Sequence, residues 1–251
     1  MIITIDGPAG SGKSTIAGLL AKKINYIHFN AGALYRGITA FLHTQNFNIN
    51  NIKADTVLPK FEIKTDLING TQHVFVNNKD YTSLLRNNLI STLVPIVSLN
   101  KTVQEKAQKC LKEFCNNNNV VIEGRGIGSS VLPNAEHKLY LDCTVEERAK
   151  RRFNEEQLKN TNITLDEIKE QIKLRDTLDQ TREIAPLVVP ENAIVIDTSN
   201  LTIDEVIDKI INALNFNWIF IKFEYLKAHI CAFFVFTLKN GENFVGFWLF
   251  D

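Results

Sequence analysis

The stretch GPAGSGKST, residues 7–15, decides the fold. It follows an alternating β-branched run, MIITID (1–6), which is typical of a strand, and it leads into STIAGLLAKKI (14–24), which has the apolar spacing of an amphipathic helix. The pattern G-x-x-x-x-G-K-[ST] between a strand and a helix predicts a phosphate-binding loop. We expect this loop to comprise Gly7, Pro8, Ala9, Gly10, Ser11, Gly12, Lys13, Ser14 and Thr15.

The chemistry expected of this loop is the binding of a nucleoside triphosphate. Its glycines let successive backbone N–H groups point into one concavity, and the helix N-terminus adds partial positive charge. Lys13 would bridge the β- and γ-phosphates, and the Ser14 hydroxyl would coordinate Mg²⁺. The alternative, a chance glycine-rich turn, is disfavoured by the flanking strand and helix patterns.

The rest of the chain alternates helix and strand patterns, which predicts an α/β fold with a parallel central sheet. We expect further strands at 26–29, 120–122, 137–141 and 193–197, and helical segments at 33–44, 86–115, 145–175 and 203–214. Period-two alternation over 57–82, around Asn69-Gly70, predicts an inserted hairpin. The aromatic-rich segment 215–251 could form a second hairpin turned by KNGEN, and its longest apolar piece, 230–238, is far too short to cross a bilayer.

Composition limits the partners. The chain has 28 Lys and Arg against 28 Asp and Glu, so no global field favours nucleic acid or an acidic membrane. The N-terminus has no signal-peptide pattern, so we expect a cytoplasmic protein with reduced cysteines, acting as a monomer.

Arginines indicate what receives the phosphate. A nucleoside monophosphate already offers an anionic oxygen as nucleophile, so a kinase acting on it needs no base, only cations that bring two polyanions together. Arg125 lies between glycines at the expected carboxyl end of a strand, where open α/β sheets bind ligands. The other candidates, which could also be solvated helix faces, are Arg36, Arg86, Arg148, Arg151, Arg152, Arg175 and Arg182.

Taken together, IDGPAGSGKST, GALYR, EGRGIG, PNAEHKLYLDCTVEERAKRR, RDTLDQTREIAPL and AIVIDTSNLTIDEVI resemble the bacterial cytidylate (CMP) kinases over about residues 1–214. The resemblance implies a three-layer P-loop kinase fold, with a monophosphate-binding insertion at about 45–86 and a helical lid at about 146–182. It implies transfer of the γ-phosphoryl group of ATP, with Mg²⁺, to CMP or dCMP. Residues 215–251 would be an extension of unassigned role.

The same resemblance implies roles for individual residues. Lys13 and Ser14 match the ATP–Mg²⁺ loop; Tyr35, Arg36, Arg86, Arg125, Arg175, Asp179 and Arg182 match the acceptor site; Arg148, Arg151 and Arg152 fall in the lid. The resemblance also implies catalytic roles for Arg125, Arg148, Arg152, Arg175 and Arg182 as well as Lys13. Asp6 and Glu123 could order Mg²⁺-bound water, or could cap a helix or form a salt bridge.

Several positions depart from the family pattern. Asn30 and Ala31 replace a carboxylate and a hydroxyl before the Tyr-Arg pair, and Gly126 replaces an aspartate that we expect near the base. Gln104 stands where the family has an arginine, and Pro95 where a small polar residue contacts cytosine. Two alternatives therefore stay open: a degenerate nucleotide-binding protein with weak turnover, and a kinase that also accepts UMP.

Overall fold

The computed structural model describes residues 1–158, 163–214, 234–237 and 243–246. The strands are β1 (Ile2–Asp6), β2 (Ile27–Asn30), β3 (Ile63–Ile68), β4 (Thr71–Val76), β5 (Lys79–Asp80), β6 (Val120–Glu123), β7 (His137–Asp142), β8 (Ile194–Asp197), β9 (Phe234–Thr237) and β10 (Asn243–Gly246). The helices are α1 (Lys13–Lys23), α2 (Ala31–Thr44), α3 (Asn88–Val97), α4 (Lys101–Cys115), α5 (Val145–Gln157), α6 (Leu165–Thr181) and α7 (Ile203–Ala213). Short helical turns lie at η1 (Ile49–Asn51), η2 (Thr82–Leu84) and η3 (Ile127–Val131).

The central sheet is five-stranded and entirely parallel, in the order β2-β6-β1-β7-β8. This confirms the predicted α/β fold with a parallel sheet. Because β1 lies in the middle, the loop that leaves its carboxyl end opens at the centre of the sheet edge. Parallel sheets place binding crevices at that edge.

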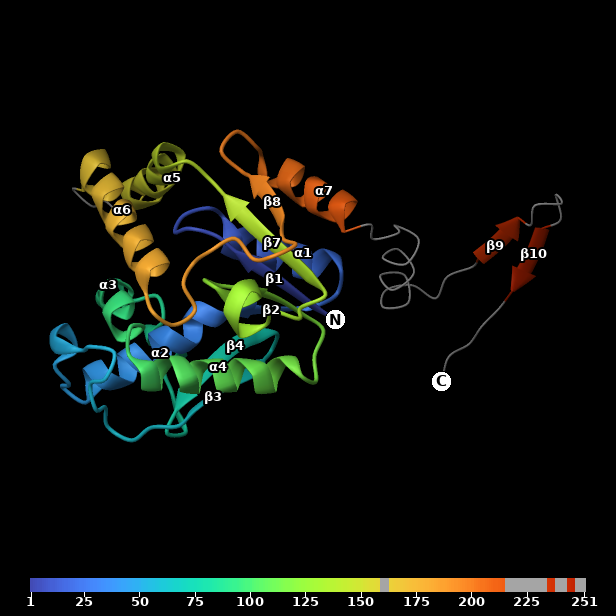
Figure 1. Ribbon diagram of the computed structural model, residues 1–251. Coiled ribbons are helices and arrows are strands. Elements are labelled where there is room, and N and C mark those ends of the chain that lie inside the picture. The colour runs from blue at the N-terminus through green and yellow to red at the C-terminus, as the bar shows by residue number, and fades with distance from the viewer. Residues whose placement is uncertain (159–162, 215–233, 238–242, 247–251) are drawn as a thin grey trace.

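Helices cover both faces of the sheet (Figure 1). One layer of the core joins β1 and β7 to α1 and α7, with Ile3, Leu20 and Ile210 fully buried. The other joins β2 and β6 to α2 and α4, with Phe29 and Ile122 fully buried. The continuous apolar run of β6 follows from this arrangement, since both of its faces are covered.

The predicted insertion hairpin is confirmed. Strands β3 and β4 pair antiparallel from Ile63↔Val76 to Ile68↔Thr71, and Asn69-Gly70 makes the turn with positive φ at both residues. A second turn, Asn77-Asn78, also has positive φ at both residues. It adds the short strand β5, which the sequence pattern did not predict. The resulting small sheet packs against α2 and α4.

The expected single helical segment over 86–115 is wrong: it is two helices, α3 and α4. Asn100 marks the break, because its Oδ1 accepts from Val103 N at 3.3 Å and caps α4, while its Nδ2 donates to the Lys53 and Thr56 carbonyls. Arg86 lies in the turn before α3 and does not open a helix.

The segment predicted as helical over 145–175 is likewise divided, into α5 and α6. Residues 159–162 between them lie outside the described part, and α6 starts at a capping box formed by Thr164 and Glu167.

Near the C-terminus, β9 and β10 pair antiparallel, as the sequence suggested, whereas most of the KNGEN turn falls outside the described residues. No helix among the described residues is long and apolar enough to span a membrane.

Candidate active site

The phosphate loop runs from the end of β1 into α1, as predicted. Gly12 is the N-cap of α1 and has φ 86°, a left-handed conformation that a side chain would disfavour. The Lys13 side chain is buried, and its Nζ donates to the Pro8 carbonyl at 2.6 Å and to Ser11 Oγ at 3.3 Å. Burial lowers the pKa of Lys13 well below its ordinary value, and the neighbouring Arg125 lowers it further. Ser14 and Thr15 are exposed at the helix start.

A large cleft of about 1620 Å³ opens at the carboxyl edge of the central sheet. It brings together parts of the chain that are far apart in sequence: the phosphate loop, α2, the β3–β4 turn, α3, the end of β6, α5, α6 and the start of α7. Among its lining residues are Gly10, Ser11, Gly12, Lys13, Ser14, Thr15, Tyr35, Arg36, Arg86, Arg125, Arg151, Arg152, Arg175 and Arg182. Gly7, Pro8 and Ala9 are not among its lining residues.

Asp179 organises the arginines at one side of the cleft. Its Oδ2 accepts from Arg125 Nε at 3.1 Å and from Arg175 Nε at 3.0 Å. Burial would raise the pKa of Asp179, but the two guanidinium groups outweigh it and the pKa is lowered. Asp179 is buried, is not among the residues that line the cleft, and holds Arg125 and Arg175 in place.

Arg182 joins the same cluster through the backbone. Its Nε donates to the Ala185 carbonyl and its Nη2 to the Arg125 carbonyl, each at 2.7 Å. Arg175 and Arg182 are partly buried, and this partial burial lowers the pKa of both. Desolvated guanidinium groups bind phosphate more strongly than solvated ones.

The start of α2 supplies Tyr35 and Arg36. Asn30 caps this helix with its Oδ1, which accepts from Ala33 N at 3.1 Å and from Arg36 Nη2 at 3.2 Å. The Asn30 amide thus accepts the same hydrogen bonds that a capping carboxylate would accept. Unlike a carboxylate, it places no negative charge beside Arg36. Tyr35 donates its hydroxyl to Gln104 Oε1 at 2.8 Å, and burial raises the pKa of Tyr35 to about 12.

The predicted lid arginines do not share one environment. Arg152 and Arg151 line the cleft, and Arg151 also donates to the Thr198 carbonyl at 2.6 Å. Arg148 does not line it: this side chain is buried, with Nε on the Cys143 carbonyl at 2.9 Å and Nη1 on the Ala9 carbonyl at 3.0 Å. Its Nε and Nη1 donors are thus occupied by backbone carbonyls, and the catalytic role expected for Arg148 stays a prediction.

Three of the positions that depart from the family pattern, Gln104, Pro95 and Gly126, are not among the residues that line the cleft. Gln104 is buried, where it accepts from Tyr35 and donates to the Ser98 carbonyl at 2.7 Å. Pro95 lies inside α3 and does not line the cleft, whereas Ser98 does. At Gly126 an added Cβ would meet the Ala185 carbonyl oxygen at 2.5 Å, so a side chain there would face the backbone and not the cleft.

The two acidic candidates have separate roles. Asp6 caps η3, since its carboxylate accepts from Ile127 N at 2.9 Å and Gly128 N at 2.7 Å. Glu123 lines the cleft at the end of β6, where its charge acts on Lys13 and Arg36. Of these two carboxylates, Glu123 is the one that lines the cleft.

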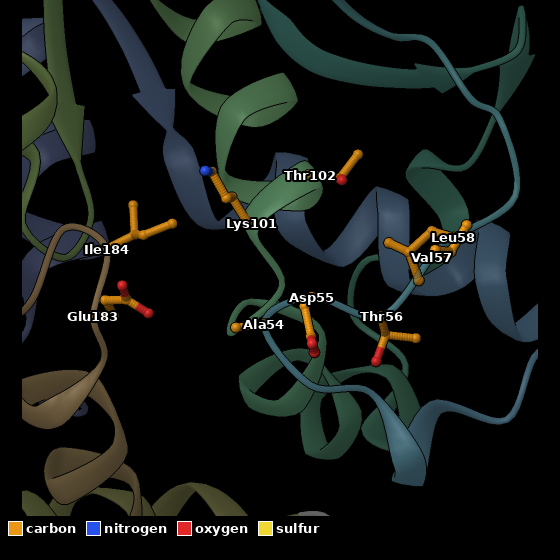
Figure 2. A pocket seen from close by; sticks show the side chains of 9 residues that line it. All are labelled: Ala54, Asp55, Thr56, Val57, Leu58, Lys101, Thr102, Glu183 and Ile184. Atoms are coloured by element: carbon orange, nitrogen blue, oxygen red, sulfur yellow. The ribbon is translucent and has the colours of Figure 1, made fainter.

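A second depression of about 660 Å³ lies outside this cleft (Figure 2). It opens between the loop carrying Asp55 and Val57, the start of α4 at Lys101, and Glu183 after α6. It contains no phosphate loop and no arginine. The groups suited to binding a polyanion therefore line the larger cleft.

The sequence interpretation missed Asp176 and Gln72. Asp176 forms a 2.7 Å ion pair with Arg148, and its position three residues before Asp179 on a helix was a usable signal. Gln72, beside the hairpin turn, lines the cleft and accepts from Asn30 N at 2.8 Å. No local pattern indicated that the hairpin reaches the central sheet.

The fold and this site define a P-loop kinase. The family model for cytidylate kinase matches residues 3–216. The chain is 44% identical over 210 residues to a cytidylate kinase of Caldicellulosiruptor saccharolyticus, covering 83% of this chain and 93% of the relative. It is 41% identical over 218 residues to a cytidylate kinase of Bacillus licheniformis, covering 86% and 96%. The chain belongs to the cytidylate kinase family.

A comparison of folds agrees with the α/β architecture. An uncharacterized protein from Eubacterium ventriosum superimposes with a TM-score of 0.50 at 12% identity, covering 86% of this chain and 99% of that one. At this identity the likeness concerns the fold alone.

Proposed function

We propose that the protein transfers the γ-phosphoryl group of ATP to CMP or dCMP, giving ADP and the corresponding diphosphate. The observation that carries this proposal is the convergence of a phosphate loop and four arginines, Arg36, Arg125, Arg175 and Arg182, on one cleft in a chain of this family. One side of the cleft suits a triphosphate and the other a monophosphate.

Lys13 and the loop N–H groups would hold the β- and γ-phosphates, which requires Lys13 Nζ to leave the Pro8 carbonyl. The four arginines would bind the acceptor phosphate and reduce the repulsion between the two polyanions. Because the attacking phosphate oxygen is already anionic, the cleft needs no general base. Arg151 and Arg152, on the lid side, are placed to balance charge on the transferring group.

The residues present fit a magnesium ion. Exposed Ser14 and buried Glu123 line the same cleft and offer the oxygen donors that Mg²⁺ prefers. When bound, the ion would neutralise charge on the transferring phosphate. We assign Ser14 as its ligand, with Glu123 acting on its coordinated water.

We further infer that residues 1–214 form the kinase domain, with the insertion at about 45–86 and the lid at about 146–182, and that the protein acts as a cytoplasmic monomer. The segment 215–251 has no part in the proposed reaction.

An acceptor panel tests the proposal. Purified full-length protein with ATP–Mg²⁺ is assayed for ADP formation against CMP, dCMP, UMP and AMP. We expect turnover of CMP and dCMP well above that of AMP. Equal turnover of UMP would show a pocket that does not discriminate between pyrimidines. No turnover with any acceptor, in protein that binds ATP, would contradict the kinase assignment.

A further inference from the structure

Arg148 and Asp176 hold one residue of the phosphate loop from two sides. Arg148 Nη1 donates to the Ala9 carbonyl at 3.0 Å, and Asp176 Oδ1 accepts from the Ala9 N–H at 3.4 Å. The two side chains pair with each other at 2.7 Å between Nη1 and Oδ2. Both polar backbone groups of Ala9 are thus bound by one ion pair.

This ion pair is shielded from water, and a further hydrogen bond from Arg148 holds its guanidinium group in place. The side chain of Arg148 is 5% exposed and that of Asp176 is 13% exposed. Arg148 Nε also donates to the Cys143 carbonyl at 2.9 Å, which anchors the guanidinium to the end of β7. The loop lies close against this arginine, since a Cβ added to Gly10 would be 3.3 Å from Arg148 Cβ. Charged hydrogen bonds in such surroundings are strong and directional.

The helix that supplies Asp176 also supplies the acceptor site. Arg175 immediately precedes Asp176 on α6, and Asp179, which holds both Arg175 and Arg125, lies three residues after Asp176. In Figure 1, α5 and α6 lie side by side at the edge of the sheet where β7 ends. A shift of α6 therefore acts on the phosphate loop and on the acceptor arginines together.

We propose that Arg148 and Asp176 form a clamp on Ala9, a pair of positioning residues that sets the phosphate loop for ATP and couples its geometry to the acceptor site through α6. Neither residue touches substrate. The clamp acts through the Ala9 backbone and through the placement of Arg175 and Asp179. The proposal relies on the proposed function only for the identity of the two nucleotides.

Two variants test the clamp without relying on an unpaired buried charge. Arg148→Met combined with Asp176→Leu removes both charges, and such neutral replacements of buried pairs are often tolerated. Arg148→Lys keeps a cation for Asp176 but cannot reach both the Ala9 and Cys143 carbonyls. Lys173→Gln, on the exposed face of α6 where Lys173 pairs with Glu170, is the matched control.

The readouts are the ATP dissociation constant without acceptor, the KM for CMP at low and saturating ATP, and the melting temperature. The dissociation constant and the KM are measured well below the melting temperature of the variant concerned. We expect the double variant and Arg148→Lys to weaken ATP binding roughly tenfold, the effect of losing one charge-assisted hydrogen bond. In both variants we also expect ATP to lose its effect on the KM for CMP, whereas Lys173→Gln should match the wild type.

Wild-type ATP affinity in both folded variants would overturn the proposal and leave the pair a purely structural one. Weakened ATP affinity with an unchanged effect of ATP on CMP would overturn the coupling through α6. If the wild-type protein turned over no CMP, the proposed function would fail, but the ATP dissociation constants would still decide whether the clamp sets the loop.

Discussion

At the scale of single residues, the surroundings of Gly126 show how a substitution can be misread from sequence. Its φ of 69° is left-handed, and an added Cβ would meet the Ala185 and Pro186 carbonyl oxygens at 2.5 and 2.8 Å. A carboxylate cannot be restored here by a side-chain change alone, because the Ala185–Pro186 backbone occupies the space. The sequence shows a missing charge, whereas the structure shows a close backbone contact.

Gly126→Ala should therefore lower stability more than Gly70→Ala. Gly70 has a similar φ of 73°, but nothing lies within 4 Å of its added Cβ, so it reports the cost of the backbone conformation alone. That cost is about 1 kcal/mol. We expect a clearly larger loss at Gly126, measured as the free energy of unfolding by urea. Equal losses of unfolding free energy at the two sites would show that the backbone at Ala185 moves aside at no cost in stability.

Lys13→Met should abolish phosphoryl transfer without lowering stability. Burial lowers the pKa of Lys13, so the folded state disfavours its charged form, and removing the charge does not cost folding energy. We expect an unchanged or higher melting temperature for the nucleotide-free protein, with turnover reduced to background. Retained turnover would show that Lys13 does not act on the transferring phosphate.

At the scale of elements, helix α6 matters most, because it carries Arg175, Asp176 and Asp179 and has Arg182 as its C-cap. The sequence alone singled out Arg175, Asp179 and Arg182, but the helical segment it predicted ends at 175, six residues before the end of α6, and it did not show what each residue contacts. Composition and spacing cannot separate Arg148, which faces the interior, from Arg152, which lines the cleft, since both lie on the charged helix α5. Burial is set by packing between helices that are distant in sequence.

Asp179 should make the folded state sensitive to acid. Its pKa lies below the ordinary 3.8 because Arg125 and Arg175 outweigh the effect of burial. The stabilisation is therefore present above about pH 4 and is lost as the pH falls through the lowered pKa. Asp179→Asn should flatten the fall in melting temperature below pH 4, and Glu170→Gln on the exposed face should leave it unchanged. An identical acid profile for wild type and Asp179→Asn would contradict the assigned pairing.

At the scale of the whole molecule, the sequence predicted the layers better than their internal breaks. The phosphate loop, the strand runs and the Asn69-Gly70 turn are local patterns, and all three lie where expected. The division of 86–115 into two helices was not predictable, because it depends on Asn100 binding the backbone of Lys53 and Thr56. Long-range contacts of this kind leave no periodic signal.

Truncation after Leu214 should leave stability and turnover close to those of the full chain. Leu214 is buried with Ile210 and Ile211 against the α1 side of the sheet, so truncation here keeps every described residue of this core layer. Ending the chain at 209 removes all three side chains and serves as the control, with an expected loss of several kcal/mol. The check is the melting temperature and kcat/KM of both truncated proteins. Loss of folding after truncation at 214 would assign part of the core to the C-terminal segment.

The most direct test of the central claim follows the phosphoryl group itself. Protein is incubated with γ-labelled ATP, Mg²⁺ and CMP, and the products are separated. The account predicts label in CDP with little in inorganic phosphate, because the arginine-lined side of the cleft places an anionic acceptor where water would otherwise react. Label released only as inorganic phosphate, at the same rate with and without CMP, would contradict it.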